Sequence, residues 1–326
     1  MERVEQAVAE TGFSGVIRID QGDEVVMEQA YGLADRASSL PCRTSTRFAM
    51  ASGSKTMTAL VTMSLVEEGL LGLTTTARSV LGDDLPLIDD AVTVEHLLAH
   101  RSGIGDYLDE DESEINDYIM SVPLHRLADT EEFLPQLEGH PQVFTPGEQF
   151  AYCNGGFVVL AVMVERVAGK GFHDLVTERV CEPAGMADSG YFRSDELPAN
   201  TALGYLEGFA QRTNVLHLPV RGSGDGGMHT TAADVRRFWT ALLEGKVVSA
   251  ATLAEMVRRR SEPQSAPSDG YGLGFWLNGD AMQLEGYDAG VSFRSRHWAQ
   301  TGTTWTVLSN TSDGAWPIWR ALEAAG

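Results

Sequence analysis

Both ends of this chain are patterned as β-strands, whereas the long stretch between them is patterned mainly as helices. Near the start, Phe13–Asp20 and Glu24–Ala30 alternate in part between apolar and polar residues, and Gln21-Gly22-Asp23 supplies a turn between them. Three segments near the end are rich in aromatic and β-branched residues: Gly272–Leu277, Ala289–Arg296 and Thr303–Ser309. Because the apolar face of a sheet must be covered, we expect one antiparallel sheet built from both termini and flanked by helices.

Helical periodicity dominates the middle of the chain. The expected helices are Ser52–Leu71, Thr93–His100, Asn154–Ala168 and Thr231–Glu244, followed by a closing helix over Trp316–Ala324. The segment Asn154–Ala168 is apolar nearly all round, which is typical of a buried helix. The chain is therefore predicted to be an α+β protein, with an α/β region formed by residues 1–60 and 265–326. Residues 61–264 form an inserted, mostly helical region, and the active site lies between the two.

The charge balance excludes several classes of function. The 326 residues include 46 acidic and 24 basic ones, giving a formal net charge of -22. Such a chain repels nucleic-acid phosphates and anionic membranes, so we expect neither as a partner. The first 20 residues carry no apolar signal-peptide core, and no run of about 18 apolar residues occurs. These features predict a cytoplasmic location and leave the oligomeric state open.

Metal and cofactor chemistry find little support in the sequence. The three cysteines, Cys42, Cys153 and Cys181, are odd in number and widely spaced, which fits neither a disulfide framework nor a zinc site. His96 and His100 are four residues apart on an expected helix, a spacing that can hold zinc, but no glutamate stands between them as in HExxH. No metal and no cofactor are therefore predicted.

One Ser-x-x-Lys motif stands where extended chain gives way to a helix. In Ser52-Gly53-Ser54-Lys55 the two reactive side chains share one helical face, and the Ser52 hydroxyl lies near the positive end of the helix. A serine becomes a nucleophile only when a neighbour takes its proton, which a lysine can do once its pKa is lowered. A plain helix cap beside a surface lysine is the alternative for this tetrapeptide alone.

A second motif, Tyr152-Cys153-Asn154, precedes the helix that we expect to be buried. A tyrosine can relay protons beside a cation, and an asparagine can orient a lysine or hold a substrate amide. Asn154 could instead simply cap its helix.

With these motifs the chain resembles the serine β-lactamase-like hydrolases: class C β-lactamases, DD-peptidases, D-aminopeptidases and family VIII carboxylesterases. Five blocks carry the resemblance in order: Phe48–Lys55, Leu97–Gly103 (LLAHRSG), Pro146–Gly155 (PGEQFAYCNG), Glu182–Met186 (EPAGM) and Gly226–Met228 (GGM). The resemblance implies a β-lactamase/transpeptidase-like fold. It also implies that Ser52 is the acylated nucleophile, that Lys55 and Tyr152 are its coupled base and acid, and that Asn154 contacts substrate or Lys55.

The third family motif, Lys-Thr-Gly or His-x-Gly on a strand beside the serine, departs from the pattern here. The matching stretch is Leu284–Gly290, and one register sets Gly286 on the motif glycine and Leu284 on the basic position. A register offset by two puts Gly286 on the basic position instead. Both lose the cation, which puts binding of a substrate carboxylate in doubt. The resemblance implies an oxyanion hole from the backbone N–H groups of Ser52 and Tyr287.

The sequence thus predicts a serine hydrolase that acts through an acyl-enzyme on small esters or on neutral or cationic amides. The alternatives are a β-lactamase or penicillin-binding DD-peptidase or D-aminopeptidase, and a non-catalytic binding protein of the same fold. The acidic stretch Asp106–Asp117 is interpreted as a solvated loop or frayed helix, or else as a rim that repels anionic substrates.

Overall fold

The computed structural model describes residues 2–108, 115, 118–208, 210–263 and 269–325. The α-helices are α1 (Glu2–Thr11), α2 (Lys55–Glu67), α3 (Ala77–Leu81), α4 (Val94–Leu98), α5 (Leu134–Leu137), α6 (Asn154–Ala168), α7 (Phe172–Val176), α8 (Glu182–Ala184), α9 (Ala232–Leu243), α10 (Ala250–Met256) and α11 (Ala315–Glu323). Shorter 3₁₀ or π turns are η1 (Ala51–Ser54), η2 (Leu124–Arg126), η3 (Thr130–Phe133) and η4 (Thr177–Cys181). The strands are β1 (Gly15–Gln21), β2 (Glu24–Tyr31), β3 (Leu33–Asp35), β4 (Leu40–Pro41), β5 (Phe48–Ala49), β6 (His229–Thr230), β7 (Asp269–Tyr271), β8 (Trp276–Asn278), β9 (Ala281–Asp288), β10 (Val291–Trp298) and β11 (Thr303–Ser309).

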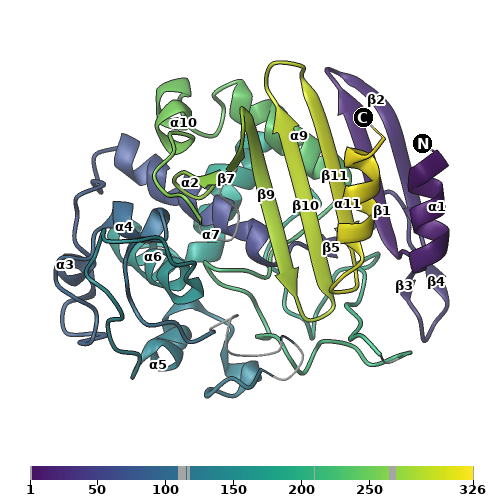
Figure 1. Cartoon of the computed structure of the whole chain (residues 1–326). Helices are drawn as coiled ribbons and strands as arrows, with labels where there is room; N and C mark the ends of the chain where they lie inside the picture. The colour runs from purple at the N-terminus through teal and green to yellow at the C-terminus, as the bar shows by residue number, and fades with distance from the viewer. Residues whose placement is uncertain (1, 109–114, 116–117, 209, 264–268, 326) are drawn as a thin grey trace.

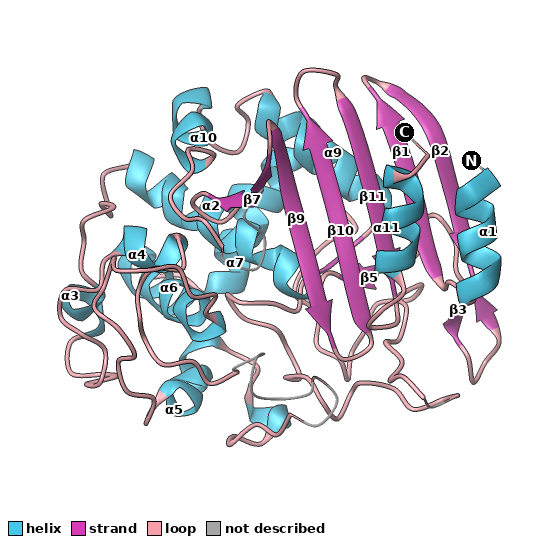
Figure 2. Cartoon of the chain, in the orientation of Figure 1, coloured by secondary structure: helices cyan, strands magenta, loops and turns pink. Residues whose placement is uncertain are grey.

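Strands from both ends of the chain form one antiparallel sheet. Its order is β2-β1-β11-β10-β9-β8-β7, so β1 from the start lies beside β11 from the end, with Gly15 opposite Ser309. Figure 2 shows this sheet in magenta with helices in cyan on both faces. The prediction of a single antiparallel sheet built from both termini is confirmed.

Helices cover the two faces of the sheet in different ways. On one face α1 and α11 pack together, and α9 packs against β1 and β11 on the other (Figure 1). Successive residues of a strand point to opposite faces, and accordingly Ile17 lies in the small core under α1 and α11 whereas Val16 lies in the large core on the other side. Both faces are therefore buried, which is why the strands at the chain ends are so rich in apolar residues.

The helix α6 forms the centre of the helical part of the molecule. It begins at Asn154 and ends at Ala168, as the sequence predicts, and Gly169 follows in the left-handed conformation (φ 64°) that ends many helices. Its residues from Asn154 to Val164 are all buried, so the prediction of a buried helix is confirmed. Within the described residues, no helix has both the length and the apolar character that crossing a membrane requires. The domain boundaries at residues 60 and 265 stay a prediction.

The predicted strand Gly272–Leu277 is wrong in part. The chain turns at Gly274 (φ 84°), between β7 and β8. A side chain at Gly274 would place its Cβ 2.2 Å from the Cβ of Ala59 in α2, and Thr56 Oγ1 donates a hydrogen bond of 2.7 Å to the Gly274 carbonyl. Close packing against α2 thus replaces a continuous strand by a turn that requires glycine.

The ring of Phe293 in β10 supports the turn that carries Ser52. Phe293 is fully buried, and a Cβ added at Gly53 would lie 2.5 Å from its ring. The absence of a side chain at Gly53 therefore lets η1 rest directly on the sheet.

We expect Phe293→Ala to lower the free energy of unfolding by about 3–5 kcal/mol, the usual cost of removing a buried ring, and Phe293→Leu to cost less. Urea denaturation followed by circular dichroism measures both. Equal stability of wild type and Phe293→Leu, with an unchanged midpoint, would contradict this account of the packing.

Candidate active site

The chain makes a strained turn immediately before Ser52. Ala51 has φ 44°, a left-handed conformation that residues with a Cβ rarely adopt. Strained backbone conformations of this kind cluster at functional sites. Backbone hydrogen bonds of 2.9 Å hold the turn, from Met50 N to Met228 O and from Gly53 N to Met50 O. Ser52 therefore lies half-buried at a fixed position in η1, just ahead of α2.

Lys55 is the first residue of α2 and is only 2% exposed. Its ammonium donates three hydrogen bonds: to Ser52 Oγ at 2.8 Å, to Asn154 Oδ1 at 2.7 Å and to the Asp225 carbonyl at 2.7 Å. Three acceptors match the three protons of an ammonium group. The buried amine is thus held in one place, pointing at the serine hydroxyl.

The ring of Tyr152 also lies close to the Lys55 ammonium. Lys55 Nζ is 4.9 Å from the centroid of the Tyr152 ring, and the ring stacks on Trp276 with an interplanar angle of 14°. The structure therefore brings Ser52, Lys55, Tyr152 and Asn154 together, although about a hundred residues separate the two pairs in sequence.

Gly286 places β9 directly against the Ser52 turn. A Cβ at Gly286 would lie 2.1 Å from Met50 O and 2.9 Å from Gly53 N, so only glycine fits. β8 pairs with β9 over 281–283, and η1 packs on β9 further along. The close approach favours the register in which Gly286 is the motif glycine.

In that register, the side chain at the basic position and the side chain after the motif glycine differ strongly in exposure. Leu284 occupies the basic position and is 2% exposed, within the large apolar core. Tyr287, the residue after the glycine, is 37% exposed and its ring lies 6.3 Å from that of Trp316. The cation that the family motif would supply is replaced here by a buried aliphatic side chain.

Asp106 belongs to the site and was not predicted to do so. Its carboxylate accepts hydrogen bonds from the first two amides of α6, Asn154 N at 2.5 Å and Gly155 N at 2.8 Å. A carboxylate is favourable at the positive end of a helix. Asp106 thereby fixes the start of the helix whose first side chain holds Lys55.

The interpretation of Asp106–Asp117 as a solvated loop or frayed helix is wrong for its first two residues. Tyr107 is buried, and its phenol donates a hydrogen bond to Asp225. Residues 109–114 and 116–117 lie outside the described residues, so the alternative of an anion-repelling rim stays a prediction. Charge counting could not separate Asp106 from the run; its position three residues after the LLAHRSG block was the available signal.

His100 lies against the Tyr152 ring and is uncharged. Burial first, and then the nearby Lys55 charge, hold the pKa of His100 well below its usual range. Its Nδ1 accepts a hydrogen bond of 3.1 Å from Cys153 N, and its ring lies 4.3 Å from that of Tyr152. A neutral imidazole here adds no second positive charge beside the lysine.

The two histidines considered as zinc ligands serve other purposes. The helix α4 ends at Leu98, and His100 follows it with φ 53°, whereas the His96 ring accepts a hydrogen bond from Thr93 N at the start of the helix. Among the described residues, no group of three or more His, Cys, Asp or Glu side chains could hold a metal ion.

Cys153 has a structural role at the same helix start. Its sulfur accepts a hydrogen bond from Gly156 N at 3.3 Å, and burial, followed by the charge of Asp106, raises the pKa of the thiol well above its ordinary value. A thiol that stays protonated is a poor nucleophile, so Cys153 caps α6 in place of Asn154.

The chain is similar to known proteins both in sequence and in structure. A model of the family described as Beta-lactamase matches residues 2–321. The crystal structure of a penicillin binding protein from Bacillus halodurans superimposes with a TM-score of 0.92 at 34% identity, covering 99% of this chain and 100% of that one. The β-lactamase/transpeptidase-like fold expected from the sequence is thereby confirmed.

Two curated relatives illustrate the range of names among similar proteins. Esterase EstB of Burkholderia gladioli is 30% identical over 302 residues, which are 83% of this chain and 76% of that protein. Penicillin-binding protein 4* of Bacillus subtilis is 28% identical over 255 residues, which are 74% of this chain. The alignment spans 54% of that second protein, so about half of its length has no counterpart here.

The buried carboxylate of Asp106 makes a pH-dependent contribution to stability. Burial raises its pKa from 3.8 to about 6, although the hydrogen bonds from Gly155 and Asn154 and the charge of Lys55 act in the opposite direction. Because the folded-state pKa is raised, the contribution of Asp106 is fully present below pH 3.8 and is lost as the pH rises through about 6.

We expect Asp106→Asn, which cannot ionise, to gain about 1–3 kcal/mol of unfolding free energy relative to wild type as the pH rises from about 4 to 7. Loss of one amide acceptor adds an offset that does not vary with pH. Urea denaturation of both proteins across this range measures the difference. Curves that stay parallel would show that the carboxylate does not titrate there.

Proposed function

The chain belongs to the beta-lactamase family, and from this premise we propose that it is a serine hydrolase that works through an acyl-enzyme. The contact of 2.8 Å between Lys55 Nζ and Ser52 Oγ is the observation that carries the proposal. A hydroxyl at the start of a helix, next to a buried amine, is the arrangement that makes serine nucleophilic. The proposed substrates are small esters and neutral or cationic amides.

In the acylation step, Ser52 Oγ forms a bond to the substrate carbonyl carbon, and the hydroxyl proton passes to the Lys55/Tyr152 pair, which for this step carries one proton fewer than an ammonium beside a phenol. The carbonyl oxygen becomes an oxyanion, which the backbone N–H groups of Ser52 and Tyr287 are proposed to stabilise. The carbonyl re-forms as the leaving group departs with the proton from the pair. Because the two groups are close, the proton belongs to the pair rather than to either residue.

Deacylation repeats these events with water as the nucleophile. Water loses its proton to the same pair, attacks the ester carbon, and Ser52 Oγ leaves with a proton. Asn154 is proposed to keep Lys55 aligned through both steps, which its hydrogen bond of 2.7 Å to the ammonium supports.

The lost third-motif cation favours esters and amides over substrates that carry a carboxylate. Leu284 carries no charge, so a substrate carboxylate beside it would have no ion partner at this position. The other two lysines, Lys170 and Lys246, form surface ion pairs with Glu178 and Glu244. The absence of a cation at the Leu284 position therefore favours an esterase or amidohydrolase over a β-lactamase or penicillin-binding enzyme.

We expect Ser52→Ala to abolish hydrolysis of p-nitrophenyl butyrate and Lys55→Ala to lower kcat by about 10²-fold or more, the usual size of a general acid–base contribution. Lys246→Ala removes a surface lysine and is the matched control. Turnover by Ser52→Ala at the wild-type rate would exclude the proposed nucleophile.

A fluorophosphonate probe should label wild type on the Ser52 peptide, seen as a mass shift, whereas a fluorescent penicillin should leave no adduct under the same conditions. A penicillin adduct on Ser52 would instead favour the β-lactamase or penicillin-binding alternative. Failure of both probes to label would favour a non-catalytic binding protein.

A further inference from the structure

A cavity of about 100 Å³ opens beside the Ser52 turn. One wall is the loop Asp225–Gly227, and a Cβ added at Gly226 would lie 3.5 Å from the Ala51 carbonyl and 3.8 Å from Ser52 N. The Lys55 ammonium bridges Ser52 Oγ and the Asp225 carbonyl. Anything bonded to Ser52 therefore needs only a short chain to reach this wall.

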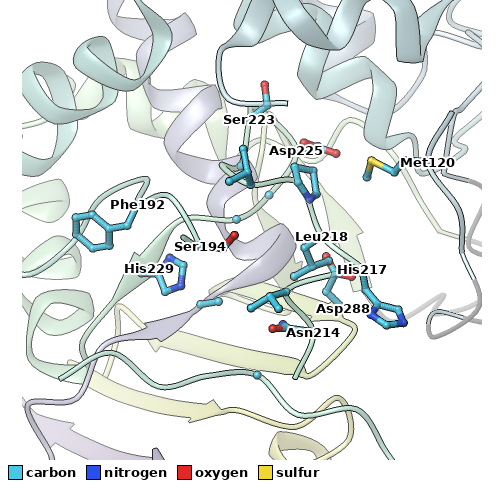
Figure 3. A pocket seen from close by; sticks show the side chains of 18 of the residues that line it. Met120, Phe192, Ser194, Asn214, His217, Leu218, Ser223, Asp225, His229 and Asp288 are labelled. Carbon is cyan, nitrogen blue, oxygen red and sulfur yellow. The ribbon is translucent and has the colours of Figure 1, made fainter. Parts of the chain in front are cut away.

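The lining of the cavity combines an apolar surface with acidic groups. Its apolar part includes Met120, Phe192, Leu218 and Val220, and its acidic side chains are Asp225 and Asp288 (Figure 3). A cavity of this volume has room for a short acyl chain. The cavity thus offers an apolar surface for such a chain and two carboxylates for a polar group at its end.

The charged groups of the cavity lining are carboxylates: Asp225 and Asp288 line it, and no lysine or arginine is among its described lining residues. Burial, followed by the charges of Asp225, Asp106 and Asp288, raises the pKa of the lining residue Tyr118. The charges of three carboxylates thus act on this phenol, and the charge of Lys55 acts on Asp225 and Asp106. An added positive charge is favourable in such a field, and an added negative charge is not.

Asp225 is the carboxylate best placed to meet a ligand. It lines the cavity, accepts a hydrogen bond from the Tyr107 phenol, and through its own carbonyl contacts Lys55. Burial raises its pKa, and the charge of Lys55 partly offsets this. A buried carboxylate in this position gains from a further cationic partner.

We propose that this cavity holds the acyl part of the substrate and that the Asp225 carboxylate binds a cationic group at its end. The preferred substrates are then short acyl donors that carry an amine, such as β-aminoacyl esters. The inference rests on the proposed serine hydrolase activity and adds to it a specificity-determining residue. Asp225 selects the substrate, and Ser52 with its lysine and tyrosine performs the reaction.

The test compares the p-nitrophenyl esters of β-alanine and butanoic acid, two chains of equal length of which only the first is cationic. For each enzyme the ratio of the two kcat/KM values is measured near pH 7, with spontaneous hydrolysis subtracted. We expect Asp225→Asn to lower this ratio by about 10-fold or more relative to wild type, the order expected when one partner of a buried charge pair is neutralised.

Asp90→Asn is the matched control because it neutralises an exposed carboxylate that pairs with Arg78 and does not line the cavity. The ratio for Asp90→Asn should stay close to that of wild type, since the charge it removes lies outside the cavity. Comparing each variant with wild type cancels the intrinsic reactivity of the two esters.

The outcomes separate the two proposals. If both esters are hydrolysed through Ser52 but Asp225→Asn leaves the ratio unchanged, the cation site is refuted and the hydrolase activity stands. An equal fall of the ratio in Asp90→Asn would assign the effect to the net charge of the protein and also overturn the proposal. Absence of Ser52-dependent turnover of either ester would refute the hydrolase itself.

Discussion

The site depends on keeping one ammonium group away from water. Burying a charge is costly unless hydrogen bonds compensate for the lost hydration, and Lys55 finds its three acceptors on three separate parts of the chain: the η1 turn, the start of α6 and the loop before β6. Each part must be in place for the amine to stay buried. The lysine therefore connects the sheet side of the molecule with its helical side.

The surroundings of the lysine are arranged to keep its charge balanced. His100 touches the same cluster but stays neutral, whereas Asp106 and Asp225 provide negative charge at short range. In the register that sets Gly286 on the motif glycine, the position of the family's usual cation is held by Leu284, which is buried and adds no charge.

Sequence patterns sufficed for those elements whose stability is local or whose faces are uniformly apolar. The bounds of α6 and β11 agree with the prediction because continuous burial and clear stop signals mark them. The helix α1 was not predicted, since it buries only Val4 and is stabilised by packing on α11 at the far end of the chain. The turn at Gly274 was also missed, because it follows from contact with Ala59.

The same distinction holds within the site. Spacing and neighbouring blocks identified the Ser52, Lys55, Tyr152 and Asn154 set, since each lies in a short motif. Motif spacing assigned no role to Asp106 or Asp225, because their roles arise from hydrogen bonds that they accept across 48 and 118 positions, from Asn154 N and from the Tyr107 phenol. Long-range polar contacts of this kind become visible only in three dimensions.

Pairing β1 with β11, and seating the Ser52 turn on β9 and β10, has a consequence for biosynthesis. The strands that support the nucleophile leave the ribosome about 230 positions after it, so a nascent chain carries Ser52 long before it can shape the turn around it. Contacts of such wide separation form late and slowly. The turn around Ser52 can therefore take its final shape only once translation has passed β10.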